Sequence, residues 1–236
     1  MCDVAIADLP RVVAFDGDDT LWHNETIFSM TQDRFRGLVG PYVDLPGHEI
    51  DARLVETERQ NLATYGYGIK GFVLSMVETA IAITDRRIPV HDIEAILGFG
   101  RTMLAHPVQL IEGARDVLET LRARDHELWL LTKGDLFDQE SKLARSGLSP
   151  LFHRIEIVSE KDESAYLRIL DRHGVSPDEF AMVGNSVRSD VLPVIAIGAR
   201  AFHIPYAITW AHETVDAHRD AAFETLPTLR SVISDQ

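Results

Sequence analysis

Three carboxylates lie within four residues, directly after an apolar segment near the start of the chain. Asp16, Asp18 and Asp19 follow the segment Val12–Phe15, with Gly17 between the first two carboxylates. The segment has no polar alternation, which predicts a short strand that is buried on both faces. Carboxylates this close raise one another's pKa unless a cation or hydrogen-bond donors compensate them. Taken alone, the acidic turn fits a reactive site or an ordinary solvated turn rich in Asp and Gly equally well.

Polar residues also follow three later segments, each of which predicts a strand. These segments are residues 127–131, for which a buried strand is expected, and residues 154–159 and 180–183, for which strands are expected. They lead to Thr132, to Lys161, and to Asn185 with Asp190. Because parallel strands of an open sheet present their carboxyl ends to one crevice, we expect these side chains to converge there with the acidic turn. Taken singly, each has a plainer explanation as a capping residue or a solvated surface lysine.

Together, these groups favour the binding of an anion that carries several oxygen atoms. The carboxylates of Asp16 and Asp190 and the amide oxygen of Asn185 are hard ligands that suit Mg²⁺. Lys161 would add a second positive charge, and Thr132 would add a hydroxyl donor. Such a combination suits a phosphoryl group above all.

The elements that must position these residues can be predicted from the alternation of apolar patterns. Helices are expected at 114–124, 136–146, 163–173 and 191–197, and a further strand at 200–204. Residues 218–236 predict a short strand and a closing helix. Strands that alternate with helices in this way predict an α/β fold, with a Rossmann-like parallel sheet core, helices on both faces and right-handed crossovers.

The region from about residue 27 to residue 106 has helical periodicity only. Prolines and glycines divide it into several helices, and it contains no apolar segment of the kind that follows Arg11. We therefore expect an all-helical insertion at residues 23–106, within a core domain formed by residues 1–22 and 107–236.

Composition limits the class of partner. The 236 residues carry a formal net charge of −14, which speaks against a nucleic acid or an anionic membrane as the main partner. Cys2 is the only cysteine, so we expect no disulfide framework and no thiolate metal site. The first ten residues are not typical of a signal peptide, and no apolar run approaches a membrane span. A cytoplasmic protein is expected, and its oligomeric state stays open.

The order of these segments resembles the four motifs of the haloacid dehalogenase superfamily. DGDDT at 16–20, the strand that ends in Thr132, Lys161 after a strand, and GNSVRSD at 184–190 occur in the family's order. The helical insertion after the first motif resembles the family's helical cap. The resemblance covers nearly the whole chain from Arg11 and implies a phosphatase-type hydrolase.

The resemblance also implies a role for each matching residue. Asp16 resembles the nucleophile that forms an aspartyl-phosphate, and Asp18 resembles the general acid and base. Thr132 would hold the phosphoryl oxygens, and Lys161 would neutralise charge. Thr20 is expected to orient Asp18. The ligands implied for Mg²⁺ are Asp16, the main-chain carbonyl of Asp18, Asn185 and Asp190.

One departure from the family pattern concerns the fourth motif. It often begins Gly-Asp, whereas this chain has Asn185, so Asp190 is expected to be the main acid of the metal site and Asn185 to come second. Three alternatives to a phosphatase stay open. They are a sugar-phosphate mutase on the same core, a metal-independent 2-haloacid dehalogenase, and a non-catalytic binding protein. A dehalogenase of this family has no acid two residues after the nucleophile, so Asp18 disfavours that alternative.

Specificity is expected to come from the cap and from residues beside the motifs. The segment Tyr65–Phe72 could present Lys70 to a substrate, although a plain helix–helix connection is favoured there. His23, at the predicted hinge, and Lys133 and Gly134, after the second motif, are further candidates for substrate binding. We hypothesise that the cap opens to admit a small phosphorylated metabolite and then closes to exclude water. The sequence does not identify that metabolite.

Overall fold

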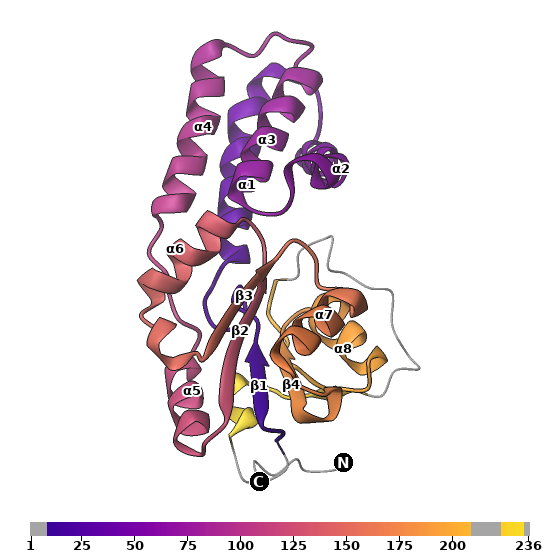
Figure 1. Cartoon of the computed structure of the whole chain (residues 1–236). Coiled ribbons are helices and arrows are strands. Elements are labelled where there is room, and N and C mark those ends of the chain that lie inside the picture. The colour runs from indigo at the N-terminus through magenta and orange to yellow at the C-terminus, as the bar shows by residue number, and fades with distance from the viewer. Residues whose placement is uncertain (1–8, 209–222, 234–236) are drawn as a thin grey trace. The chain divides into compact units, whose positions relative to one another are not determined.

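The computed structural model describes residues 9–208 and 223–233, and it divides into two compact units (Figure 1). One unit contains the described residues up to Asn24 together with those from Val108 onward. The other unit is Glu25–Pro107. The second unit is thus inserted into the sequence of the first, directly after the acidic turn. We propose that these units act as catalytic core and cap.

The first unit is built on a six-stranded sheet in which every neighbouring pair of strands is parallel. The strands are β1 (Val12–Phe15), β2 (Glu127–Lys133), β3 (Arg154–Val158), β4 (Phe180–Gly184), β5 (Arg200–His203) and β6 (Glu224–Thr225). Their order in the sheet is β3-β2-β1-β4-β5-β6. Because β1 lies between β2 and β4, the segments that follow these three strands meet at one edge of the sheet. The predicted parallel α/β fold is confirmed.

Helices cover both faces of this sheet, as the apolar, fully buried strands β1 and β4 require. α5 (Ala114–Ala123) and α6 (Leu136–Ser146) contribute to one apolar cluster, while α7 (Glu163–His173) and α8 (Leu192–Ala196) contribute to the other. In β1, Val13 and Phe15 belong to the first cluster, and Val12 and Ala14 belong to the second. All four side chains are fully buried. A strand buried on both faces has no need of polar alternation, which explains its sequence.

The second unit consists of helices, in agreement with the predicted helical insertion. They are α1 (Glu25–Val39), α2 (Gly47–Tyr65), α3 (Ile69–Ile83) and α4 (Val90–Ala105). Their apolar core includes Phe35, Leu54, Met76 and Ile96. Gly66 and Gly68 connect α2 to α3 with φ angles of 71° and 112°, a conformation that glycine adopts without strain.

Three local details differ from the prediction. β2 continues through Thr132 to Lys133 rather than ending at residue 131. A π-helical turn, Val187–Val191, comes before α8, so the α-helix begins at Leu192 and not at residue 191. Of the C-terminal segment, the described part forms β6 and a 3₁₀ helix at Leu229–Val232, and the rest of the predicted closing helix lies outside the described residues.

Within residues 9–208 and 223–233, no helix has both the length and the apolar character that crossing a membrane requires.

Candidate active site

The turn after β1 is held by main-chain hydrogen bonds. The N–H of Asp16 donates to the carbonyl of Val183 at 2.9 Å, so Asp16 continues the pairing of β1 with β4. A side chain at Gly17 would bring its Cβ within 2.6 Å of the Trp22 ring, so the turn requires glycine there. Asp19 has a φ of 60°, and its carboxylate accepts from the N–H of Asn24 at 2.9 Å. Asp19 therefore braces the turn.

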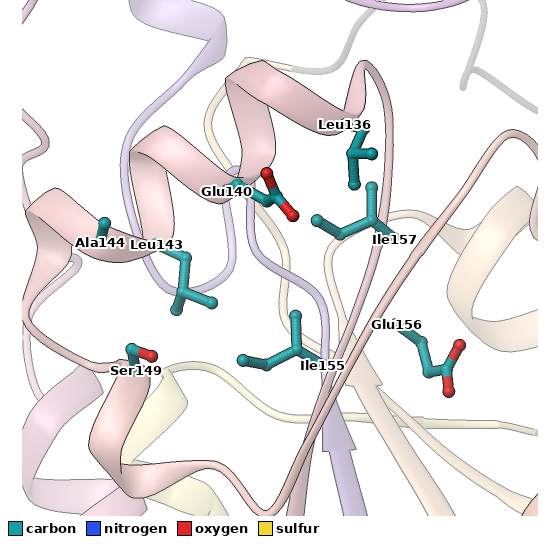
Figure 2. Close-up of a pocket in the computed structure, with 8 residues that line it drawn as sticks. All are labelled: Leu136, Glu140, Leu143, Ala144, Ser149, Ile155, Glu156 and Ile157. Carbon is teal, nitrogen blue, oxygen red and sulfur yellow. The ribbon is translucent and has the colours of Figure 1, made fainter.

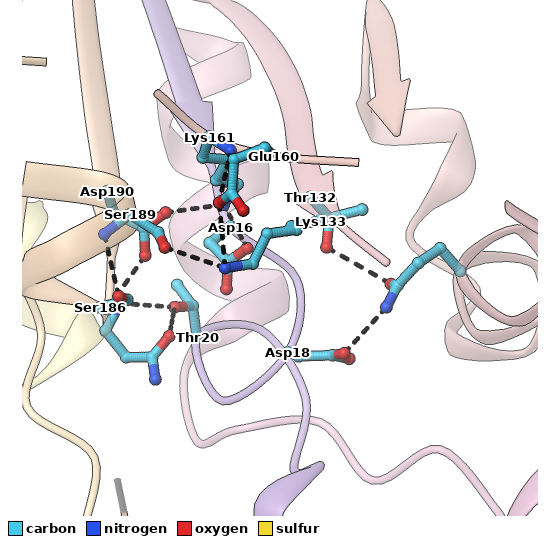
Figure 3. A network of polar contacts seen from close by, with 12 residues as sticks. Asp16, Asp18, Thr20, Thr132, Lys133, Glu160, Lys161, Ser186, Ser189 and Asp190 are labelled. Carbon is cyan, nitrogen blue, oxygen red and sulfur yellow. Dashed lines mark hydrogen bonds and ion pairs between the residues drawn. The ribbon is translucent and has the colours of Figure 1, made fainter. Parts of the chain in front are cut away.

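Lys161 joins two carboxylates that follow different strands of the sheet, as Figure 3 shows. Its Nζ lies 2.5 Å from Oδ1 of Asp16 and 2.6 Å from Oδ1 of Asp190. The other oxygen of Asp190 accepts from the N–H of Ser186 at 3.0 Å. Gly184 makes room for this arrangement, because a Cβ there would lie 2.2 Å from Oδ2 of Asp190. Segments after β1, β3 and β4 therefore meet in one buried charge cluster.

This cluster carries more negative charge than positive charge. Burial raises the pKa of Asp16 to about 7, although the ammonium of Lys161 opposes that rise. Burial disfavours the charge of Lys161 too, but Asp16 and Asp190 outweigh this effect and raise the pKa of the lysine. Two carboxylates thus share one buried ammonium, and a further cation would be stabilised beside them.

The available donor atoms suit a metal ion that keeps water ligands. Oδ2 of Asp16 makes no hydrogen bond to another described residue. No three His, Cys, Asp or Glu side chains in the described parts of the chain form a complete metal cluster. A metal at this edge would therefore depend on carboxylate and amide oxygens together with main-chain oxygen and water. Mg²⁺ accepts such a partial protein shell.

Asp18 belongs to a separate group of contacts on the other side of the turn. Its Oδ1 accepts from Nε1 of Trp22 at 2.6 Å, and its Oδ2 accepts from Nε2 of Gln139 at 2.8 Å. The Nζ of Lys142 lies 3.0 Å from both oxygens. The sequence prediction missed Gln139 and Lys142. The signal that could have found them is polar side chains on the buried face of an amphipathic helix, α6.

The last two residues of β2, with Gly134 directly after them, contact neighbours of both groups. Thr132 is almost fully buried, and its hydroxyl donates to Oε1 of Gln139 at 3.4 Å. Lys133 Nζ lies 3.1 Å from Oγ of Ser189 and 3.5 Å from a carboxylate oxygen of Glu160. The N–H of Gly134 donates to the carbonyl of Val158 at 3.1 Å. That amide is therefore engaged within the fold.

The expectation that Thr20 orients Asp18 is wrong. The hydroxyl of Thr20 donates to Oδ1 of Asn185 at 3.2 Å and accepts from the N–H of Asn185 at 3.0 Å. Thr20 therefore links the first motif to the fourth. Its side chain reaches a neighbouring strand end rather than the carboxylate two residues before it, because β4 lies directly beside β1.

Two further candidates for substrate binding lie in different units. His23 is partly buried in the first unit, where Nδ1 forms a hydrogen bond of 2.7 Å with the hydroxyl of Tyr206. Lys70 is exposed in the first turn of α3, in the second unit. Their roles in substrate binding stay predictions.

A cavity of about 510 Å³ lies between α6 and the edge strand β3 (Figure 2). Leu136, Leu143, Ile155 and Ile157 are among the residues that line it. None of the predicted site residues does so. The charge cluster of Lys161 is therefore distinct from this cavity.

Comparison with known proteins agrees with this arrangement of strands and motifs. The model of the haloacid dehalogenase-like hydrolase family matches residues 10–198. The chain belongs to this family of hydrolases and is therefore an enzyme. A haloacid dehalogenase-like family hydrolase from Xanthomonas campestris has a similar structure, with 42% identity and a TM-score of 0.84 over 95% of this chain and 89% of that chain.

More distant similarities include proteins of different named activities. The pyrimidine 5'-nucleotidase PynA from Streptococcus pneumoniae is 30% identical over 94 residues, which are 37% of this chain and 40% of that protein. The matched part thus spans less than half the length of that relative. A 2-haloacid dehalogenase from Pseudomonas syringae shares the fold, with 20% identity and a TM-score of 0.61 over 94% of this chain and 95% of that chain.

Proposed function

We propose that the chain is a Mg²⁺-dependent phosphomonoester hydrolase that acts through an aspartyl-phosphate on Asp16. One observation carries the proposal. Asp16 and Asp18 lie two residues apart, yet each is held by a different lysine from a different element. A nucleophile and a proton-transfer group need such separate environments, because their protonation states must differ during the reaction.

The proposed reaction has two displacements at phosphorus. In the first, an oxygen of Asp16 attacks phosphorus while the bond to the ester oxygen breaks, and Asp18 gives its proton to the departing alkoxide. In the second, water attacks the phosphorus of the aspartyl-phosphate and gives its proton to Asp18. The bond from Asp16 to phosphorus then breaks, and inorganic phosphate leaves.

The remaining site residues supply charge and hydrogen bonds for these steps. Lys161 would keep Asp16 in place and offset the approach of an anionic ester. The hydroxyl of Thr132, with nearby main-chain N–H groups, would hold the phosphoryl oxygens. Asp16, Asp190, Asn185 and the carbonyl of Asp18 would hold Mg²⁺, which when bound supplies the charge that lets a carboxylate approach a phosphate.

A sugar-phosphate mutase is the strongest alternative, since it would use the same residues. It differs in the fate of the phosphoryl group, which would return to a substrate hydroxyl rather than pass to water. A dehalogenase attacks carbon and has no use for a carboxylate at position 18. A non-catalytic protein has no need of the buried charge cluster around Lys161, which costs stability. The hydrolase therefore fits these residues best.

The decisive experiment is release of inorganic phosphate from a panel of phosphorylated metabolites, with and without Mg²⁺. Pyrimidine nucleoside monophosphates enter the panel first, because the nucleotidase similarity suggests them. We expect Mg²⁺-dependent phosphate release from wild type and none from Asp16→Asn. Release of halide from 2-haloacids, or isomerisation of sugar phosphates without phosphate release, would contradict the proposal.

Substrate recognition by the proposed cap is tested on the same panel. We expect Lys70→Ala and His23→Ala to change the preference among substrates. If both variants turned over every substrate at the wild-type rate, these residues would have no part in recognition.

A further inference from the structure

The carboxylate of Asp18 is held from two directions. Trp22, on its own turn, donates to one oxygen, and Gln139, on α6, donates to the other. Lys142, one helical turn after Gln139, contacts both oxygens at 3.0 Å. Figure 3 shows Asp18 and Thr132 at the two ends of one chain of contacts, separate from the carboxylates around Lys161. The rotamer of Asp18 is thus set mainly by α6.

Lys142 is itself restrained in several ways. Its Nζ lies 2.7 Å from Oδ1 of Asn24 and 3.2 Å from Oδ2 of Asp138. Only 9% of its side chain is exposed. Burial opposes its charge, but Asp18 and Asp138 outweigh burial and raise its pKa. A lysine is seldom this buried unless its charge is paired. The ammonium group is therefore held in one position by its carboxylate partners.

Gln139 adds a link between two residues of the proposed reaction. Its amide N–H donates to Asp18, and its amide oxygen accepts from the hydroxyl of Thr132 at 3.4 Å. In the proposed function, Thr132 holds the phosphoryl group and Asp18 moves the proton. One side chain of α6 therefore fixes the position of Asp18 relative to Thr132.

We propose that Lys142 and Gln139 are positioning residues that place Asp18 for proton transfer to and from the ester. The inference rests on the proposed phosphatase activity and extends it to a helix outside the four motifs. Neither residue touches the reacting atoms. Each acts by holding the carboxylate of Asp18, so their loss should impair the steps that use that carboxylate and spare the attack by Asp16.

This prediction can be separated from a general loss of structure by the choice of leaving group. A nitrophenolate leaves phosphorus without a proton, whereas an alkoxide needs one. In Lys142→Met, we expect the first turnover of p-nitrophenyl phosphate, measured by rapid mixing, to stay within about threefold of wild type. Turnover of an alkyl phosphate should fall about tenfold or more, mainly in kcat rather than KM.

Two further variants make the test complete. Gln139→Met removes one donor to Asp18 and should give the same pattern to a smaller extent. It carries the test if Lys142→Met does not fold. Arg145→Met is the matched control, because Arg145 is exposed on the same helix, and it should change neither rate.

The outcomes distinguish the inference from the function on which it rests. If wild type hydrolyses no phosphate ester, the proposed function is wrong and the inference falls with it. If wild type is active but Lys142→Met and Gln139→Met slow both substrates equally, the function stands and the positioning role is wrong. The inference is supported if either variant loses more rate with the alkyl phosphate than with p-nitrophenyl phosphate, and Arg145→Met shows no such difference.

Discussion

Removing the ammonium of Lys161 should destabilise the protein strongly, because two buried carboxylates would lose their shared partner. In Lys161→Met, the butyl stem is replaced by an apolar chain of similar length, while Asp16 and Asp190 keep their places. Their side chains are 10% and 1% exposed, so water compensates little. We expect the free energy of unfolding to fall by about 3–5 kcal/mol, the usual cost of breaking a buried ion pair.

The contact distances support this magnitude. At 2.5 and 2.6 Å, each contact contributes a gross attraction of roughly 6 kcal/mol at an effective dielectric constant of about 20. Desolvation of the ammonium and repulsion between the carboxylates reduce the net value. A domain has about 5–15 kcal/mol of stability, so the variant should still fold.

The assay is urea unfolding at pH 8 in EDTA, which keeps divalent cations away from the cluster. Lys161→Met/Asp16→Asn removes one of the two stranded charges and should recover about half of the loss. Arg101→Met, at an exposed position on α4, is the control and should stay within about 0.5 kcal/mol of wild type. The reasoning is refuted if Lys161→Met loses less than about 1 kcal/mol, or if the double variant is no more stable than the single one.

Three more predictions concern other residues. Gly184→Ala should cost about 1–3 kcal/mol in urea unfolding, because its Cβ would meet Asp190 at 2.2 Å, whereas Gly37→Ala, with no atom within 4 Å, should cost nothing. Burial raises the pKa of Glu58 to about 8, so its ionisation lowers stability as pH rises from 4.5 toward 8; Glu58→Gln should therefore stabilise the protein by on the order of 1–3 kcal/mol at pH 8 and have no effect at pH 4. Equal stability of this variant and wild type at both pH values would contradict the assignment. Asp190→Ala should abolish Mg²⁺-dependent phosphate release, and Asn185→Ala should leave it nearly unchanged; the reverse order would make Asn185 the main ligand.

Strands β1, β2 and β4 could be predicted from sequence because each combines a short apolar run with a polar residue at or soon after its end. A run such as Val12–Phe15 admits few alternatives, since all four side chains must be buried. The rule that parallel strands present their ends to one crevice then brought Asp16, Lys161 and Asp190 together without knowledge of the strand order. The structure places these three side chains in one cluster.

The contacts of individual side chains were harder to predict. Which face of α6 is buried depends on how the helix packs, and its polar residues Gln139 and Lys142 look like ordinary surface positions in the sequence. The sequence favours Asp18 as the partner of Thr20, because the two are close in the chain, whereas the hydroxyl of Thr20 bonds to Asn185, 165 positions away. The spacing of residues within a motif suggests contacts between residues that are close in the chain, whereas a parallel sheet brings the ends of distant strands into contact.

The acidic turn is best understood as two charge sites that share one short loop. Asp16 continues β1 and meets Lys161, which follows β3, whereas Asp18 leaves the strand and meets Lys142 on α6. If both carboxylates shared one lysine, their charges would be coupled, and a proton gained by one would change the other. Separate lysines loosen that coupling, so Asp18 can exchange a proton while Asp16 stays an anion that attacks. Asp18 should therefore be unable to replace Asp16 as the nucleophile. A variant that keeps Asp18 but lacks the carboxylate at position 16, Asp16→Asn, should form no covalent phosphoryl adduct, even with an activated ester such as p-nitrophenyl phosphate.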